Sequence, residues 1–309
     1  MADFEVLVAH RVGAAEIAEI RTLLDVVSSA DGHPPLAEHK WIDLAGGGRR
    51  GFLALLCRDD AGHLAGYAQL TGDDGAWGVE VAVHPARRAG PADLTATLLG
   101  AAVGQVRRAG GGRLRYWAAK PTQREERAAA SLGFAPDRDL LQLRVPLPLD
   151  ESVRRGAGPP AVRPFRPGQD EAAWLAVNNR AFADHPEQGG WDLATLQDRE
   201  RQDWFDPAGF LLLEEGGRLV GSCWTKVHRD ADPPLGEIYV ISVDPDFHGR
   251  GLGRALTVAG LDHLAASGIT TGMLYVDADN RAGTALYRSL GFTRDHLDRA
   301  FLLEVTGEG

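Results

Sequence analysis

The chain has 309 residues and a formal net charge of −10, with 44% hydrophobic and 25% charged residues. This composition is typical of globular proteins. The chain is long enough for two domains, each with its own core. The negative charge disfavours general binding to nucleic acid or to an anionic membrane, so we expect small-molecule partners. No apolar run approaches the roughly 20 residues that span a bilayer, and the N-terminus lacks a signal-peptide pattern. We therefore expect a cytoplasmic monomer.

Its two cysteines, Cys57 and Cys223, both lie in apolar strand patterns. Two cysteines cannot form a disulfide framework or a zinc cluster, so we expect buried thiols and no metal site.

An internal repeat divides the chain. The segment GFLALLCRDDAGHLAGYAQL aligns with GFLLLEEGGRLVGSCWTKV, VAVHP with ISVDP, and SLGF occurs in both halves, at offsets of 158, 160 and 158 residues. Three matches in the same order indicate two copies of one fold. A segment rich in Pro, Gly and charge separates them, as is typical of a linker. We predict an N-terminal domain over 1–150, a linker over 151–162 and a C-terminal domain over 163–309.

The second copy alternates between strand and helix patterns. In chain order we expect a strand at 161–165, helices at 169–182 and 192–202, a hairpin of 210–215 with 218–228, a strand at 237–243, a helix at 251–267, a strand at 272–278, a helix at 281–291, and final strands at 292–297 and 300–305. This order predicts an α/β fold with a mixed sheet. The strands before and after the 251–267 helix should be parallel, because a helix connects them.

A glycine-rich turn, HGRGLG, joins the strand at 237–243 to the next helix. Gly249, Gly251 and Gly253 have no Cβ, so the chain can adopt positive φ and aim its amide N–H groups at a ligand. A helix N-terminus favours negative charge, and Arg250 and Arg254 lie beside it, which predicts a phosphate site. The alternative is a flexible turn with solvated arginines. A P-loop is disfavoured because no GK[ST] follows.

The order VDP, HGRGLG, YVDADN, ALYRSLGF resembles the GCN5-related N-acetyltransferase (GNAT) superfamily. The resemblance implies two tandem domains, each a mixed, mostly antiparallel sheet flanked by helices, with a central parallel pair that splays apart for the pantetheine arm. It implies acetyl-CoA as the acetyl donor. His248 departs from the family pattern, which usually has Gln or Arg there. The implied acetyl-CoA contacts are Ile241, Ser242, Val243, His248, Gly249, Arg250, Gly251, Leu252, Gly253, Arg254, Asn280, Ala282 and Ala285, with Val81, Ala82 and Val83 in the first copy.

Further peptides, HPEQGGW, WFDP and WTKVH, resemble one tandem member of this superfamily, which acetylates the cysteinyl amine of a cysteine, glucosamine and inositol conjugate. Two alternatives stay open, an acetyltransferase for another small amine and a non-catalytic module that senses acetyl-CoA. The implied substrate contacts are Glu38, Glu187, Lys226, Glu237 and Tyr275, with Asp277 on the same strand face as Tyr275.

Acetyl transfer to an amine needs a base, an oxyanion donor and an acid. Glu237, on the strand that leads to the splay, is the candidate base, and Tyr287 is the candidate acid for the leaving sulfur. The N–H of Val243 or Ile241 would polarise the acetyl carbonyl. The alternatives are an exposed strand-edge charge for Glu237 and an ordinary core aromatic residue for Tyr287.

Two histidines near these motifs, His185 and His228, are also conceivable bases. Neither has a carboxylate at ligand or triad spacing in the sequence, so we interpret both as structural.

The first copy lacks both catalytic groups. The offset of 160 aligns Trp77 with Glu237, and the offset of 158 aligns Ala129 with Tyr287. We therefore expect a catalytically silent domain.

The phosphate turn of the first copy has become HPARRAGPADL, in which Pro91 has no N–H and Gly90 remains. Arg87 and Arg88 would still be able to hold acetyl-CoA there.

Overall fold

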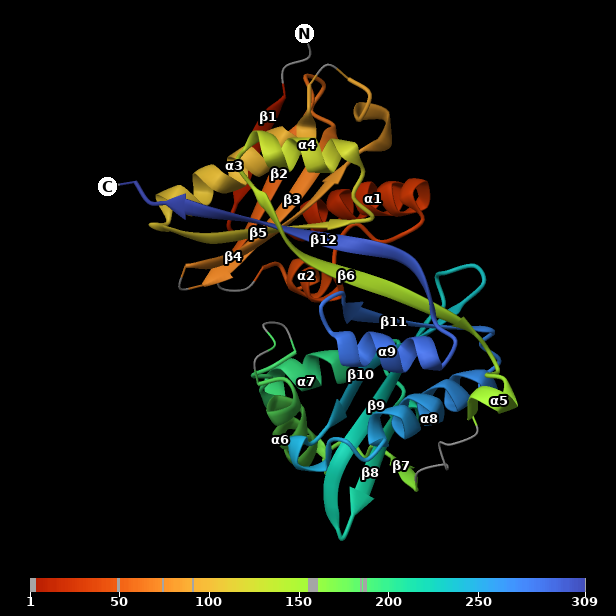
Figure 1. Cartoon of the computed structure of the whole chain (residues 1–309). Helices are drawn as coiled ribbons and strands as arrows, with labels where there is room; N and C mark the ends of the chain where they lie inside the picture. The colour runs from red at the N-terminus through yellow and green to blue at the C-terminus, as the bar shows by residue number, and fades with distance from the viewer. Residues whose placement is uncertain are drawn as a thin grey trace. The chain divides into compact units, whose positions relative to one another are not determined.

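Figure 1 shows a computed structural model of the chain, which describes residues 4–48, 51–73, 75–90, 92–154, 161–183, 185 and 188–308. The chain forms two compact units. Unit 1 comprises Met1–Leu140 and Leu297–Gly309, and unit 2 comprises Leu141–His296.

The unit boundaries differ from the predicted domain boundaries because each half of the chain gives a strand to the other unit. In β12 (Thr293–Thr306), residues 298–306 pair antiparallel with β5 (Gly111–Ala119) of unit 1. In β6 (Ala135–Pro146), residues from Leu141 onward belong to unit 2. A strand pattern shows that a segment pairs but not which edge it joins, so the sequence did not indicate this exchange.

Unit 1 is a mixed sheet with helices on both faces. Its strand order is β1-β2-β3-β4-β5-β12, and β4 and β5 form its parallel pair. Figure 1 shows α3 and α4 together on one face. Its other elements are β1 (Glu5–Ala9), α1 (Ala14–Asp31), α2 (Glu38–Ala45), β2 (Phe52–Arg58), β3 (Leu64–Asp73), β4 (Ala76–Val83), the 3-10 turn η1 (Pro85–Arg87), α3 (Leu94–Arg108) and α4 (Gln123–Ser131).

Two apolar layers hold the helices of unit 1 against its sheet. One layer, which includes Leu98 and Tyr116, packs α3 and α4 on one face, and the other, which includes Ile20 and Tyr67, packs α1 and α2 on the opposite face. This arrangement follows from the alternation of side chains along each strand.

Unit 2 repeats the same architecture. Its strand order is β6-β11-β10-β9-β8-β7, and β10 and β11 are parallel, as predicted for the strands that flank the glycine turn. The predicted strands at 292–297 and 300–305 are one continuous strand, β12. Its other elements are α5 (Glu151–Arg154), β7 (Val162–Pro164), α6 (Glu171–Ala181), α7 (Leu193–Glu200), η2 (Pro207–Gly209), β8 (Phe210–Glu215), β9 (Arg218–His228), β10 (Leu235–Val243), η3 (Pro245–Phe247), α8 (Leu252–Ala266), β11 (Thr271–Asp277) and α9 (Arg281–Ser289).

The two faces of this second sheet carry different cores. An aliphatic layer that includes Leu261 and Leu274 lies under α8 and α9, and an aromatic layer around Trp174 and Trp224 lies under α6 and α7. The N-terminus of α7 is capped by a side chain. The Asp192 carboxylate accepts a hydrogen bond from the N–H of Thr195 at 2.8 Å.

The cysteine prediction is confirmed, because Cys57 and Cys223 are both free and buried. In the described part of the chain, no helix combines the length and the apolar character needed to cross a bilayer.

Candidate active site

The candidate active site of unit 2 begins where its two parallel strands separate. β10 and β11 pair at Gly236/Gly272 and at Glu237/Met273. Among the described residues this pairing goes no further, although β10 continues to Val243. The edge of β10 beyond Glu237 therefore keeps backbone groups available to a ligand. This agrees with the splay expected from the sequence.

A β-bulge in β10 coincides with this separation. Ile238 lies opposite Thr225 of β9 and Val240 lies opposite Trp224, so Tyr239 is the extra residue of the bulge. A bulge bends the strand and increases its twist. It therefore redirects β10 at the point where β11 leaves it.

The end of β10 presents amide groups to the open edge. The N–H of Asp244 donates to the carbonyl of Val220 in β9, at 2.9 Å. Because the direction alternates along a strand, the N–H groups of Val243 and Ile241 point to the other edge. These are the predicted oxyanion donors, and their role stays a prediction. The side chain of Ser242 is buried and its Oγ lies 2.9 Å from Oγ of Ser222, so the role of Ser242 as a cofactor contact stays a prediction.

The glycine turn leads directly into α8. Gly249 and Gly251 adopt φ of +76° and +77°, as expected, whereas Gly253 lies inside the helix, and the prediction of positive φ there was wrong. The first hydrogen bond of α8 runs from the N–H of Ala255 to the carbonyl of Gly251. The amide groups of 252–254 therefore have no acceptor within the helix, an arrangement that favours an anion, and the phosphate site there stays a prediction.

A buried carboxylate and a histidine fix the shape of this turn. Asp244 accepts hydrogen bonds from the N–H of Asp246 at 3.0 Å and from Nη2 of Arg218 at 2.7 Å. Nε2 of His248 lies 3.0 Å from the carbonyl oxygen of Val243 and so ties the turn back to the strand. His248 thus has a structural contact that does not depend on the family's usual Gln or Arg.

Both arginines of the turn have partners within the protein. Arg250 forms an ion pair with Glu215 at 3.0 Å, and Nη1 of Arg254 donates to Oγ of Ser289 at 2.7 Å. The role of both arginines as phosphate contacts stays a prediction.

The start of α9 carries the remaining predicted cofactor contacts. Oδ1 of Asn280 accepts from the N–H of Gly283 at 2.8 Å, so Asn280 caps the helix. Ala282 and Ala285 are exposed on the same helix.

The candidate acid, Tyr287, is buried on α9 at 8% exposure. Burial, together with the nearby Cys223, raises the pKa of Tyr287 to about 12. Its ring packs edge-on against Phe292. The phenol therefore keeps its proton at neutral pH, as a general acid must.

The candidate base, Glu237, lies beside two basic residues of β9. Lys226 is directly opposite Glu237 in the ladder, and Nε2 of His228 lies 2.7 Å from Oε2 of Glu237. The sequence spacing did not reveal this carboxylate neighbour, and the interpretation of His228 as structural stays a prediction. Sequence spacing does not show which residues of a hairpin become cross-strand neighbours.

Aromatic rings and a glutamine hold two of the predicted substrate residues. Nζ of Lys226 lies 4.5 Å from the centre of the Trp204 ring and 5.4 Å from that of Tyr239. Tyr275 is 40% exposed, and its hydroxyl accepts from Nε2 of Gln142 at 2.8 Å. No motif in the sequence pointed to Gln142, which comes from β6.

The other predicted substrate residues are Asp277, Glu38 and Glu187. Asp277 lies 3.6 Å from Nε2 of His185, a neighbour that the sequence spacing did not reveal, and the interpretation of His185 as structural stays a prediction. Glu38 is the first residue of α2 in unit 1, and Glu187 lies outside the described residues. Both stay predictions.

The corresponding strands of unit 1 are joined over a longer stretch. β4 and β5 pair at five positions, from Ala76/Arg113 to Glu80/Trp117. The register of β4 with β3 is continuous across the whole strand, so β4 has no equivalent of the bulge at Tyr239. These strands therefore lack the early separation found in unit 2.

The bulge also changes which residue of unit 1 corresponds to Glu237. Trp77 packs on the α3 side of the sheet, whereas Gly78 faces the α2 side, where a Cβ would lie 3.7 Å from Nζ of Lys40. Gly78 therefore corresponds to Glu237, and the alignment with Trp77 was wrong by one residue. Nζ of Lys40 donates to the carbonyl of Gly78 at 2.9 Å, so an ammonium group occupies this position in unit 1.

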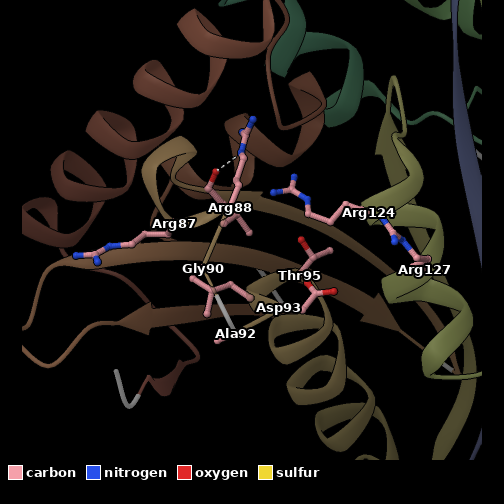
Figure 2. Close-up of a pocket in the computed structure, with 10 residues that line it drawn as sticks. Arg87, Arg88, Gly90, Ala92, Asp93, Thr95, Arg124 and Arg127 are labelled. Atoms are coloured by element: carbon pink, nitrogen blue, oxygen red, sulfur yellow. Dashed lines mark hydrogen bonds between the residues drawn. The ribbon is translucent and has the colours of Figure 1, made fainter. Parts of the chain in front are cut away.

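Unit 1 retains a basic cavity of about 320 Å³ after β4. Figure 2 shows Arg87 and Arg88 from the turn and Arg124 and Arg127 from α4 around it, with Arg88 bonded to the carbonyl of Val83 at 3.0 Å. Three of these arginines also pair with carboxylates: Arg87 with Asp59, Arg88 with Asp31 and Arg124 with Glu125. The predicted contacts Val81, Ala82 and Val83 end β4 beside this cavity, and their role stays a prediction.

Among the described residues, no three His, Cys, Asp or Glu side chains gather in a way that would hold a metal ion.

Solved structures share this architecture. A tandem GNAT protein from the clavulanic acid biosynthesis pathway has a TM-score of 0.73 at 15% identity, with 99% of this chain and 100% of that chain covered. A GCN5-related N-acetyltransferase from Sphaerobacter thermophilus has a TM-score of 0.70 at 23% identity, with 99% and 97% covered. At these identities the likeness establishes the fold.

The model of the Acetyltransferase (GNAT) family matches residues 174–292, which contain the splay, the glycine turn and Tyr287. The fold and the family match together define the class of the protein. It is an N-acetyltransferase that uses acetyl-CoA and a small-molecule acceptor.

A mycothiol acetyltransferase of Acidimicrobium ferrooxidans is 45% identical over 283 residues, with 90% of this chain and 91% of the relative covered. One of Streptomyces avermitilis is 45% identical over 307 residues, with 98% and 96% covered. The chain belongs to the mycothiol acetyltransferase family.

Proposed function

We propose that this enzyme transfers the acetyl group of acetyl-CoA directly to the cysteinyl amine of a cysteine, glucosamine and inositol conjugate, the last step of mycothiol biosynthesis. The observation that carries the proposal is the identity of about 45% to mycothiol acetyltransferases over nearly the whole chain. That span includes the substrate peptides HPEQGGW and WTKVH, which lie outside the generic acetyl-CoA motif.

The chemistry follows from the residues around the splay. Glu237 takes a proton from the substrate ammonium group, and the free amine attacks the thioester carbon. The oxygen that becomes negative accepts hydrogen bonds from the N–H of Val243 or Ile241. When the tetrahedral intermediate collapses, the C–S bond breaks and the sulfur takes the phenolic proton of Tyr287, while the nitrogen loses its second proton, which returns Tyr287 to its phenol form. The burial of Tyr287, which keeps its phenol protonated, supports this role.

The substrate residues are assigned by their charge and position. Lys226 and Tyr275 would hydrogen-bond to the sugar and inositol hydroxyls, and Glu187 would pair with the cationic amine. Glu38 of unit 1 would be a further substrate contact. The acetyl-CoA pyrophosphate would bind at the N-terminus of α8.

We propose that catalysis takes place in unit 2. Its counterpart has Gly78 in place of the base and Ala129 in place of the acid, and its strands stay paired where β10 and β11 separate. The basic cavity in Figure 2 is where unit 1 would hold a second acetyl-CoA without turning it over. We further propose a cytoplasmic monomer without nucleic-acid or membrane partners, in keeping with the net charge of −10.

The test is turnover on a panel of amines. The protein is incubated with acetyl-CoA and the conjugate, and free coenzyme A thiol and the mass of the acetylated product are measured. Matched reactions use free cysteine, glucosamine and lysine. The proposal predicts kcat/KM for the conjugate at least about 100-fold above the others, which is roughly 2.7 kcal/mol of additional transition-state binding. Faster turnover of another amine would contradict the substrate assignment, and binding without turnover of any amine would indicate an acetyl-CoA sensor.

A further inference from the structure

The carboxylate of Glu237 is hydrogen-bonded to an imidazole for which the chemistry above has no role. Nε2 of His228 lies 2.7 Å from Oε2 of Glu237. The side chain of Glu237 is 10% exposed and that of His228 is 26% exposed, so solvent competes little for this contact. A hydrogen bond of this length to a carboxylate at a nearly buried site restricts the orientation of both side chains.

The strand register produces this contact. His228 is the last residue of β9 and lies opposite Leu235, while Lys226 lies opposite Glu237. Side chains two residues apart in a strand share a face, so Glu237 meets Lys226 directly and His228 on the diagonal. The pair lies on the regular part of the ladder, before the bulge that begins after Ile238. The backbone that carries both side chains is therefore held by continuous pairing.

We propose that His228 is a positioning residue for the amine-activation step. This proposal rests on Glu237 as the base, as given under the proposed function. In it, the Nε2–H of His228 donates to Oε2 of Glu237, which leaves Oε1 to take the proton of the substrate amine. His228 does not touch the reacting atoms, and it acts by holding one rotamer of the carboxylate.

The size of the effect follows from the flexibility of glutamate. Its side chain has three rotatable bonds, and an unrestrained carboxylate moves by more than the roughly 0.5 Å that a catalytic group tolerates. Misplacement by about 1 Å lowers turnover by as much as roughly 10². The acetyl-CoA site at the N-terminus of α8 is formed by other residues, so its affinity should not depend on His228.

The experiment compares His228→Ala, His228→Gln and His263→Ala in the full-length enzyme. His263 is the matched control, because its side chain is also 26% exposed and it lies 3.9 Å from a carboxylate, Asp206, away from the splay. We expect His228→Ala to lower kcat about 10- to 100-fold with an unchanged KM for acetyl-CoA. His228→Gln should recover most of that loss, since its amide N–H can donate to Glu237. His263→Ala should keep the wild-type kcat.

A double variant separates positioning from a general structural effect. If His228 acts through Glu237, His228→Ala combined with Glu237→Gln should be no slower than Glu237→Gln alone, because the carboxylate that it orients is already gone. A wild-type kcat in His228→Ala, or a double variant that is slower by the full His228→Ala factor, would overturn the positioning role and leave the base in place. Wild-type turnover in Glu237→Gln would instead overturn the proposed base, and with it this role.

Discussion

Unit 2 should not fold stably without the strand that it takes from the N-terminal half of the chain. The perturbation is deletion of residues 1–155, which removes Leu141–Pro146 of β6 together with the segment that follows it. The matched control is the fragment 141–296, which keeps all of unit 2. If the two tandem copies were separate along the chain, both fragments would fold equally well.

The expected loss can be worked out from the buried side chains. Leu143, Val145, Leu147 and Leu149 are between 3% and 8% exposed in the core of unit 2. Burying such side chains contributes about 6–12 kcal/mol for the four together, as an upper estimate. That is comparable to the whole free energy of unfolding of a typical domain, about 5–15 kcal/mol. The N–H of Leu147 also loses its hydrogen bond to the carbonyl of Thr270, which is 2.9 Å long.

The assay is urea unfolding of both fragments, followed by circular dichroism, with acetyl-CoA binding by calorimetry. Fragment 141–296 should unfold cooperatively, and fragment 156–309 should show no cooperative transition and no acetyl-CoA binding. If 156–309 unfolded at the same urea concentration as 141–296, the assignment of β6 to the sheet of unit 2 would be refuted.

Three further predictions concern the site and its support. Tyr287→Phe should lower kcat by roughly 10² to 10⁴ with little change in acetyl-CoA affinity. Because the pKa of Tyr287 is raised to about 12, the wild-type kcat should show no loss from ionisation of Tyr287 until the pH nears that value. Both are measured by steady-state kinetics across pH, and full turnover in the variant would contradict the role of Tyr287. Gly251→Val, at φ +77°, should cost about 1–2 kcal/mol in backbone strain at the proposed phosphate site and weaken acetyl-CoA binding about tenfold, as measured by calorimetry. The control is Gly268→Val, at φ +82° beyond the other end of α8, which should leave the Kd for acetyl-CoA unchanged. Equal Kd values for both variants would place the phosphate elsewhere. Burial would raise the pKa of Asp170, but hydrogen bonds from Arg163 and Arg166 hold that pKa well below its usual value. The stability that the Asp170 carboxylate contributes is therefore present above about pH 4 and is lost as the pH falls through the pKa of Asp170 in the folded protein. Asp170→Asn should therefore unfold about 2 kcal/mol more easily at pH 7, with a smaller difference at low pH, and a difference that is equal at both pH values in urea titrations would refute the pairing.

Local features of this chain were predictable because they depend on neighbouring residues. The glycine turn, the helix after it and the parallel strands on either side follow from periodicity and from residues without a Cβ, and the structure has them at Gly249, Gly251 and β10/β11. The repeat was visible because both copies keep the same short peptides at nearly the same spacing.

Features that depend on pairing were not predictable. Glu237 and His228 are nine residues apart in the sequence and meet because the hairpin register makes them diagonal neighbours. The single extra residue at Tyr239 shifted the alignment of the two copies and hid Gly78 as the counterpart of Glu237, the proposed base. The exchange of β6 and β12 depends on which edge of a sheet each strand joins, which a period of two residues does not specify.

The most direct test of the central claim, acetyl transfer by Glu237 in unit 2, is the rate of coenzyme A release from acetyl-CoA and the cysteinyl conjugate by the wild type and by Glu237→Gln. The account predicts that the wild type turns over the conjugate and that the variant loses roughly 10² to 10⁴ in kcat, because an amide cannot take the amine proton. Acetyl-CoA affinity, measured on the same samples, should stay unchanged, because its proposed site is formed by the turn and α8. A Glu237→Gln variant that releases coenzyme A at the wild-type rate would contradict the account.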